Sequence, residues 1–315
     1  MATYSSSISD SAWFRGLVTG PIAGLCSRLV VYPADTIKAR LQVQGAIPHQ
    51  GSALPYRNTL HAMQQIATKE GFLGFYRGFS AVALGSIPAN MAFFSGYELG
   101  KVIVPGQGVA TDICVGAIAQ LVGSVVFTPV DVIKERMQVQ AMMRSSYSYT
   151  GPLHAIECLV KERGVTGLLK GYWATNVVWV PWSALYLAGY ELAKTAAAKS
   201  LGTQDGASSS PDSIQPPSTL PVPVLFACSA AAASAAAVLT HPMDVVKTRL
   251  QVLSASTSVA AADLTSWSVF RQLAAEGPRA LLTSGLTARI LTLAPGTAIS
   301  WVVYDIGSSL FKSQA

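Results

Sequence analysis

Three segments of the chain repeat one pattern of charged residues: an aspartate two residues after a proline, and a lysine three residues after the aspartate. The segments are Pro33–Gln42, Pro129–Gln138 and Pro242–Gln251. Residues three apart lie on one face of a helix, and single charges inside an apolar helix are costly unless they find partners. The simplest arrangement pairs each aspartate with the lysine of another copy. The pattern therefore predicts buried ion pairs between the copies.

The three charged segments lie in an unusually apolar chain, which indicates that membrane-spanning helices position them. Of the 315 residues, 12% are charged and 50% are hydrophobic, whereas about a quarter of a soluble protein's residues are charged. Stretches long enough to cross a bilayer, about 20 residues, lie between the charge clusters. A pattern that recurs three times indicates a repeat protein. We therefore predict an all-α membrane protein with six transmembrane helices in three repeats.

The expected spans cover residues 12–44, 80–101, 111–140, 173–194, 223–252 and 287–312. In the first span, Pro33 removes an amide donor and bends the helix, which turns its charged end inward. Residues 56–69 are expected to form a short amphipathic helix along the membrane surface. Residues 200–220 are rich in Ser, Pro and Gly and are expected to form a disordered linker. The repeats are expected at residues 12–105, 106–199 and 221–313.

Several other classes of function are disfavoured. The net charge is +6, but Lys and Arg are scattered, without a basic run or interleaved aromatic residues, so no nucleic acid is expected. The four cysteines lie far apart, which predicts neither a zinc site nor a disulfide framework. Neither a nucleophile motif nor a glycine-rich phosphate loop is present. We therefore expect no enzyme, no metal and no cofactor, and favour anionic lipid or an anionic solute as the partner.

The repeated motif resembles the signature of the mitochondrial carrier family, and the resemblance covers essentially the whole chain. It implies six helices in three pseudo-symmetric repeats, each with a short surface helix on the matrix side, around a central solute path. It also implies a monomer in the mitochondrial inner membrane, although a peroxisomal or plastid membrane stays open. The stretches around Arg28 and over Phe270–Glu276 resemble branched-chain amino-acid carriers in particular.

The resemblance assigns the charged residues to two gates. The matrix gate pairs Asp35 with Lys134, Asp131 with Lys247 and Asp244 with Lys38, and its glutamine braces are Gln42, Gln138 and Gln251. The cytoplasmic gate comprises Tyr97, Glu98, Lys101, Tyr190, Glu191, Lys194, Tyr304 and Asp305, with the links Lys101 to Glu191 and Lys194 to Asp305. Its third link is missing, because Ser308 offers no cation to Glu98. We therefore expect the empty protein to rest with the matrix gate closed.

Helical spacing indicates which residues face the central path. Arg28 lies seven residues before Asp35, almost on the same helix face, and Gln120 shares the axial face of the third span. The counterparts of Arg28 in the other repeats are Ser124 and Ala237, so this arginine breaks the threefold symmetry. We expect it to bind an anionic group of the cargo. The alternative is a local partner for the gate acids.

The spacing known for the family adds further candidate contacts with the cargo. They are Gly85, Val178, Trp179, Thr292 and Leu293. Trp179 could stack on a ring or close over an apolar side chain, and it could equally pack against lipid or a neighbouring helix. Arg289, near the start of the sixth span, could serve the cargo or a lipid phosphate. The segment Glu70–Gly78 resembles the cardiolipin-binding connection of the family.

These features predict a transporter that works by alternating access between two salt-bridge gates. The expected cargo is a small anionic or zwitterionic metabolite, with an amino acid as the first candidate. A phosphorylated cofactor or nucleotide, and a metal ion, are alternative cargoes. A degenerate carrier acting as a membrane scaffold or receptor is the alternative from another class, although a static scaffold has no need of six gate charges.

Overall fold

The computed structural model of the chain describes residues 24–44, 56–106, 108–143, 147–201, 220–254, 264–297 and 299. Within these ranges the regular structure is entirely helical, as the sequence predicts. Tyr304, Asp305 and Ser308 lie outside the described residues, as do most of the predicted linker and the outer parts of the first and sixth spans.

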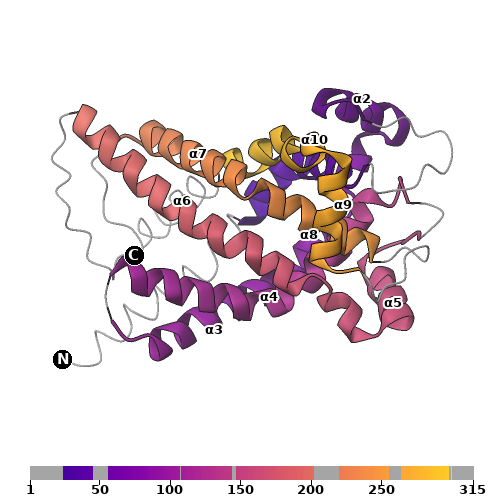
Figure 1. Cartoon of the computed structure of the whole chain (residues 1–315), viewed down its shortest axis with the longest axis horizontal. Coiled ribbons are helices and arrows are strands. Elements are labelled where there is room, and N and C mark those ends of the chain that lie inside the picture. The colour runs from indigo at the N-terminus through magenta and orange to yellow at the C-terminus, as the bar shows by residue number, and fades with distance from the viewer. Residues whose placement is uncertain are drawn as a thin grey trace, which may run out of the picture.

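Each repeat places a short helix between two long ones (Figure 1). Repeat one comprises a helix over residues 24–43, α2 (Thr59–Glu70), the 3-10 helix η1 (Phe72–Tyr76) and α3 (Phe79–Ile103). Repeat two comprises α4 (Val109–Val139), α5 (Pro152–Arg163), the 3-10 helix η2 (Val165–Leu169) and α6 (Tyr172–Ser200). Repeat three comprises α7 (Val222–Leu239), α8 (His241–Leu253), α9 (Ser266–Glu276), α10 (Pro278–Leu282) and a helix over residues 286–297.

The motif prolines act differently from one repeat to the next. Pro129 lies inside the continuous helix α4, whereas in repeat three the helix breaks before Pro242 and α7 meets α8 at an angle of 66°. Pro242 occupies the first turn of α8, where its missing amide donor costs nothing. The predicted bend is therefore a true break in the third repeat.

The apolar side of each motif helix packs against the surface helix of its own repeat. Ile37 and Leu41 pack with Ile66 of α2 in repeat one. The matching clusters join α4 to Leu159 of α5 and α8 to Leu273 of α9. Because one side of each motif helix is held in this way, the opposite side, which carries the charges, faces the other repeats. The surface helices thus orient the charged residues.

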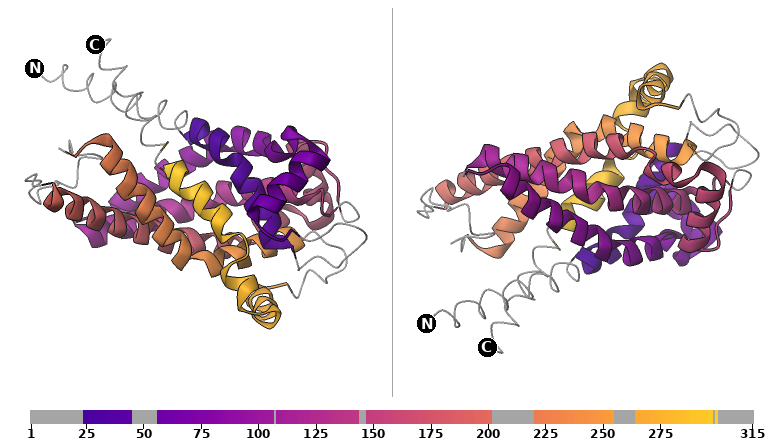
Figure 2. Two further views of the ribbon diagram at one scale, coloured as in Figure 1. Left: turned by 90° about the horizontal axis from the view of Figure 1, so that it is seen from above. Right: turned by 90° about the horizontal axis from the view of Figure 1, so that it is seen from below.

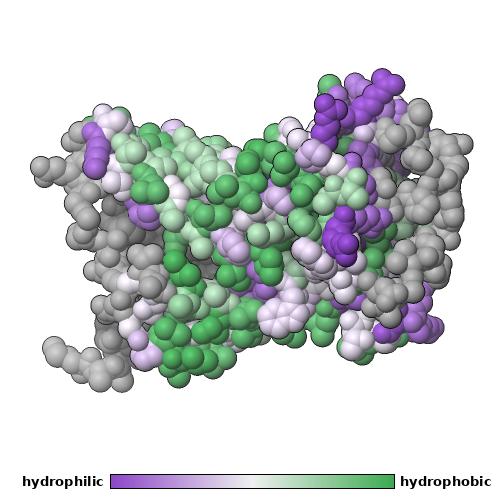
Figure 3. Space-filling view, in the orientation of Figure 1, coloured by the Kyte–Doolittle hydropathy of each residue, from purple (hydrophilic) through white to green (hydrophobic). Residues whose placement is uncertain are grey.

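The long helices run along the long axis of the molecule, and α2, α5 and α9 gather at one end (Figures 1 and 2). Helix α3 packs along α4, and α6 packs along α7. Hydrophobic side chains cover the middle of the face shown in Figure 3, while hydrophilic ones gather over the end with the short helices. This distribution matches a protein whose middle lies in lipid and whose short helices lie at the membrane surface.

Among the described residues, the segments Phe72–Ile103 and Thr111–Val139 are each long and apolar enough to cross a membrane. The bent pair Pro223–Leu239 and His241–Leu253 is a third such segment if it forms one span. Helix α6 has 29 residues but carries several tryptophans and tyrosines in place of aliphatic residues. The architecture is the predicted all-α membrane fold of three repeats.

Candidate functional site

A cavity of about 480 Å³ lies between the long helices. Its walls come from the helix over residues 24–43, from α4, α6 and α8, and from the helix over residues 286–297, so all three repeats contribute. The volume lies within the range of about 300–1,000 Å³ found for small-molecule pockets. The motif charges line the floor of this cavity, at the end where the surface helices pack.

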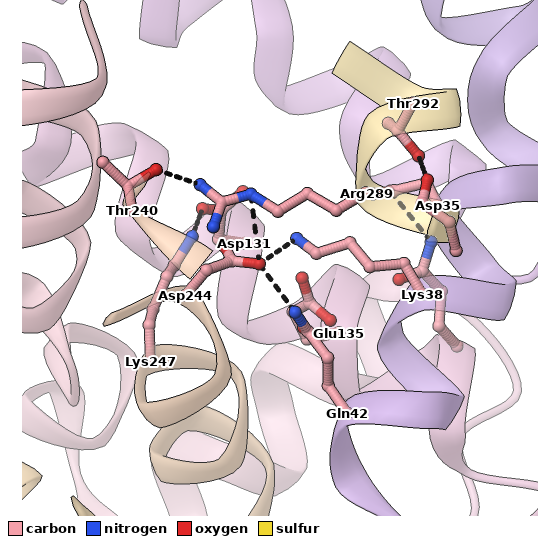
Figure 4. A network of polar contacts seen from close by, with 12 residues as sticks. Asp35, Lys38, Gln42, Asp131, Glu135, Thr240, Asp244, Lys247, Arg289 and Thr292 are labelled. Carbon is pink, nitrogen blue, oxygen red and sulfur yellow. Dashed lines mark hydrogen bonds and ion pairs between the residues drawn. The ribbon is translucent and has the colours of Figure 1, made fainter. Parts of the chain in front are cut away.

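Three ion pairs join the repeats at the floor, and Figure 4 shows two of them, Lys38 with Asp244 and Lys247 with Asp131. They join Lys38 Nζ to Asp244 Oδ2 at 2.9 Å, Lys134 Nζ to Asp35 Oδ2 at 2.6 Å, and Lys247 Nζ to Asp131 Oδ2 at 2.7 Å. Each aspartate pairs with the lysine that the sequence assigns to it. The pairs form a closed ring around the pseudo-threefold axis, and all six residues line the cavity. The ring therefore separates the cavity from the end of the molecule where the short helices lie.

Two of the three glutamines brace this ring. The amide of Gln42 donates to Asp244 Oδ2 at 2.7 Å, and that of Gln138 donates to Asp35 Oδ2 at 3.2 Å. Gln251 instead donates to the hydroxyl of Thr175 in α6, at 3.3 Å. The predicted brace on Asp131 is therefore absent from this structure, because a hydroxyl on a neighbouring helix takes the amide.

A second ring lies beneath the first, and the sequence prediction missed it. Each motif carries an arginine two residues after its lysine, and these arginines, Arg40, Arg136 and Arg249, are almost completely buried. Their Nε atoms donate to the backbone carbonyls of Gln138, Gln251 and Gln42, at 3.0, 3.1 and 2.9 Å. Every repeat is thus tied to the next by an arginine as well as by an ion pair. The threefold recurrence of this arginine was the signal that could have revealed it.

Two of these arginines also bind an acid at the end of a surface helix. Arg40 binds both carboxylate oxygens of Glu70, at the end of α2. Arg249 Nη1 lies 2.7 Å from Glu276 Oε1, at the end of α9. Arg136 instead donates from Nη2 to the hydroxyl of Ser254, at 3.0 Å. The surface helices are therefore coupled to the ring in repeats one and three by ion pairs.

Most of the predicted cargo contacts line the cavity. They are Arg28, Gln120, Trp179, Arg289, Thr292 and Leu293. Gly85 and Val178 are not among the residues that line it in this structure. A Cβ atom on Gly85 would lie 2.3 Å from Val130 Cγ2, so this glycine serves the close packing of α3 on α4. Val178 is fully buried.

One wall of the cavity is aromatic. Trp179, Trp182 and Tyr186 of α6 all line it. The ring of Trp182 stacks on that of Tyr186 with centroids 5.2 Å apart, and Tyr186 stacks in turn on Tyr190 at 6.1 Å. Trp182 was not among the predicted contacts, although its helical spacing from Trp179 and Tyr186 could have indicated it. This wall offers apolar area and an indole N–H to a bound molecule.

The two arginines of the cavity lie in contrasting surroundings. Arg28 is exposed in the wall and makes no hydrogen bond or ion pair to any residue described. Arg289 is 1% exposed and donates from Nη2 to Thr240 Oγ1 at 2.7 Å. Its Nε lies 3.7 Å from Asp244 Oδ2. Arg289 thus lies at the cavity floor, beside the ion-pair ring.

The residues expected in the opposite gate make local contacts. Lys101 lies 3.9 Å from Glu98 and over the ring of Tyr97, while Lys194 lies 3.0 Å from Glu191 and over that of Tyr190. The predicted link from Lys101 to Glu191 is therefore not formed in this structure. Each lysine has an acid three residues earlier on its own helix, which competes with an acid on another helix. The link to Asp305 involves a residue outside the described ranges.

Known proteins are similar to this chain over most of its length. A family model described as mitochondrial carrier protein matches residues 9–108, 105–201 and 218–315. Mitochondrial substrate carrier family protein E of Dictyostelium discoideum is 31% identical over 308 residues, covering 94% of this chain and 95% of its own. A mitochondrial glutathione transporter of Xenopus tropicalis is 26% identical over 330 residues, covering 94% and 91%. Mitoferrin of Caenorhabditis briggsae is 28% identical over 310 residues, covering 92% and 89%.

Members of this family are transporters of small molecules in mitochondrial membranes. The three matches of the family model follow one another along the chain and together cover nearly all of it. They coincide with the three structural repeats that supply the ion-pair ring. The protein therefore belongs to the mitochondrial carrier family.

Proposed function

We propose that the protein carries a small anionic or zwitterionic metabolite, with an amino acid as the first candidate, across the mitochondrial inner membrane by alternating access. The observation that supports this most is the cavity of about 480 Å³ whose floor is a ring of three ion pairs between repeats. In this conformation the ring is the closed matrix gate. The cytoplasmic residues, which pair within their own helices, belong to the open gate.

The energetics of buried ion pairs suit a gate. Desolvating two charges costs about as much free energy as their attraction returns, so such a pair adds little net stability. Leaving one of the two charges buried without its partner is very costly. A bound cargo can shift the balance between two conformations only by binding one of them better than the other. Opening the ring therefore requires contacts that the cargo makes more strongly as the repeats separate.

The charges of the cavity favour an anion over a metal ion. Among the charged residues found to line it, five are cationic and four are acidic. The three lysines belong to the ring, and Arg289 lies beside Asp244. Arg28 remains as the cation without an acid in contact among the described residues. An exposed guanidinium that forms no ion pair with a described acid attracts carboxylates and phosphates and repels cations.

The names of two relatives suggest other cargoes. One is called a glutathione transporter, which bears on an anionic peptide-like cargo, and another is called mitoferrin, which bears on a metal. The stacked aromatic wall formed by Trp179, Trp182 and Tyr186 leaves a nucleotide as the second candidate. The complete ring argues against a static scaffold, because such a scaffold gains nothing from charges that can separate.

We also propose that the protein works as a monomer and binds cardiolipin near the end of α2. The cavity and its ring are built from the three repeats of one chain, so no second copy is needed to complete them. The segment after α2 places Arg77, which also lies 3.2 Å from Glu70, just before the N-terminus of α3, and a basic side chain beside a helix N-terminus suits a lipid phosphate.

Replacing Arg28 by glutamine is expected to raise the KM for uptake about tenfold or more, because a charge-assisted hydrogen bond contributes roughly 1.5–3 kcal/mol. A thermal-stability screen of the purified protein against metabolites identifies the cargo first. Uptake is then measured in liposomes. Arg57→Gln removes an exposed arginine outside the cavity and is the matched control. An unchanged KM in Arg28→Gln would remove this residue from the site, and uptake of no solute by the native protein would favour the scaffold.

A further inference from the structure

Two ionisable residues at the cavity floor break the threefold symmetry. Glu135 follows the gate lysine of repeat two, and its counterparts are Ala39 and Thr248. Arg289 lies four residues after Gly285, and its counterparts in the other repeats are Val82 and Thr175. Because two repeats do without a charge at each position, the fold itself does not require one. An asymmetric feature on a symmetric scaffold is where an asymmetric ligand can be recognised.

Glu135 is a buried acid with spare capacity to accept hydrogen bonds. Its side chain lines the cavity, and the residue is 3% exposed. Oε1 lies 3.7 Å from Lys134 Nζ, which is already committed to Asp35 at 2.6 Å. Oε2 has no hydrogen-bond partner in the part of the chain that the structure describes. A buried carboxylate oxygen in this state is costly, so a donor that reaches it is bound favourably.

Arg289 has the complementary property. It also lines the cavity, and its only hydrogen bond to a described residue runs from Nη2 to Thr240. Nε and Nη1 are buried without a hydrogen-bond partner among the described residues. The nearby Oδ2 of Asp244 is already shared by Lys38 and Gln42. Figure 4 shows Arg289 linked to Asp244, which Lys38 also contacts, and Glu135 is drawn in the same network.

We propose that Glu135 and Arg289 form a dipolar subsite that takes the ammonium and the carboxylate of a zwitterionic α-amino acid as the matrix gate loosens. The proposal rests on the transport function proposed above and names its cargo class. An ammonium group supplies donors for Oε2 of Glu135, and a carboxylate supplies acceptors for Nε and Nη1 of Arg289. A cargo that carries both groups on one carbon atom offers a donor to Glu135 and an acceptor to Arg289.

The burial of these atoms sets the moment at which they act. With the ring closed, Oε2 of Glu135 and Nε and Nη1 of Arg289 are buried, although both residues line the cavity. The cargo can contact these atoms only when the floor begins to open. Their contacts therefore stabilise the transition state of opening and not the first complex with the cargo. Interactions made only in the transition state raise the maximal rate without tightening ground-state binding. Arg28, exposed in the wall, provides the initial capture.

The test uses Glu135→Gln and Arg289→Gln in the full-length protein, reconstituted in liposomes. Both variants are expected to lower the maximal rate of α-amino acid uptake about tenfold or more, while the KM and the ligand concentration for half-maximal thermal stabilisation change less than about twofold. Glu157→Gln removes an exposed acid of α5 and is the matched control for the same substitution. Glu135→Thr introduces the residue that repeat three carries at the equivalent position, and thermal unfolding of this variant checks whether the protein still folds without the acid.

Analogues of the cargo separate this subsite from a purely structural pair of charges. The native protein is expected to bind an N-acetylated amino acid, through Arg28, but to transport it poorly, because the analogue lacks the ammonium group. Glu135→Gln is expected to remove the difference in maximal rate between the amino acid and its N-acetyl form. Arg289→Gln is expected to remove the difference between the amino acid and its amide.

Three outcomes would overturn the subsite. One is rapid transport of the N-acetyl analogue by the native protein. Another is a loss of rate in the variants that is equal for every analogue, which would indicate a structural role. The third is that the native protein transports other solutes but no amino acid, which would overturn the subsite and leave the carrier function standing. Transport of no solute at all would overturn the carrier function itself.

Discussion

Replacing Asp244 by asparagine is expected to abolish uptake and to lower the free energy of unfolding by about 3–5 kcal/mol. Asp244 Oδ2 accepts from Lys38 at 2.9 Å and Gln42 at 2.7 Å, and Arg289 lies 3.7 Å away. Its side chain is 2% exposed. Removing the carboxylate charge leaves two buried cations without their anion. Thermal unfolding of the purified protein and uptake in liposomes measure the two effects.

Asp131→Asn is the matched comparison. Asp131 forms a single ion pair, with Lys247 at 2.7 Å, and its side chain is 19% exposed. Water can therefore replace part of what the substitution removes, and a smaller loss of stability is expected than for Asp244→Asn. Equal losses in the two variants would contradict the central position of Asp244. Normal uptake by either variant would contradict the role of the ring as a gate.

Replacing Arg249 by glutamine is expected to lower the free energy of unfolding by about 3–5 kcal/mol, as much as Asp244→Asn. The guanidinium is buried and binds Glu276 at 2.7 Å, the carbonyl of Gln42 at 2.9 Å and that of Gln44 at 3.2 Å. These contacts tie α8 to its own surface helix and to repeat one. A lysine cannot reproduce this fork of donors, so Arg249→Lys is expected to restore only part of the stability.

Arg136→Gln provides the comparison for this second layer. Arg136 donates to the carbonyl of Gln251 and the hydroxyl of Ser254 but forms no ion pair with a described acid. Its replacement leaves no carboxylate without a partner, and a smaller loss is expected. Chemical or thermal unfolding of Arg249→Gln and Arg136→Gln shows which variant loses more stability. A larger loss in Arg136→Gln would show that the ion pair with Glu276 contributes little.

The ion-pair ring was predictable because its residues recur with identical spacing. A proline, an aspartate and a lysine at fixed intervals, three times over, leave few arrangements in an apolar setting. The arginine ring escaped prediction for a physical reason. An arginine near the end of an amphipathic helix is usually solvated, and only the packing of three repeats brings Arg40, Arg136 and Arg249 against the carbonyls of their neighbours.

Individual cavity contacts were less predictable. Spacing along a helix sets the direction of a side chain but not its distance from the next helix. Gly85 was expected at the cavity, whereas it lies where α3 touches Val130 of α4. Trp182 was overlooked, because a buried tryptophan in a sequence looks the same whether it faces a neighbouring helix or a cavity. Its place in the stacked row with Tyr186 follows from the packing of α6.

The residues expected in the cytoplasmic gate show a different ambiguity. Glu191 is three residues before Lys194 on α6 and was also expected to reach Lys101 on α3. The same acid can serve a local pair or a pair between helices, and the choice depends on how far apart the helix ends lie. Spacing cannot supply that distance. In this structure the local pair with Lys194 is formed, at 3.0 Å.

Exchanging the two charges of one gate pair tests the account most directly. We expect Asp131→Lys and Lys247→Asp each to abolish uptake into liposomes, since each puts two like charges where one ion pair at 2.7 Å now lies. The double variant restores an ion pair in reverse and is expected to recover a measurable part of the uptake per folded protein. Uptake by either single variant at the native rate, or a folded double variant no more active than the singles, would contradict the claim that these ion pairs form the gate.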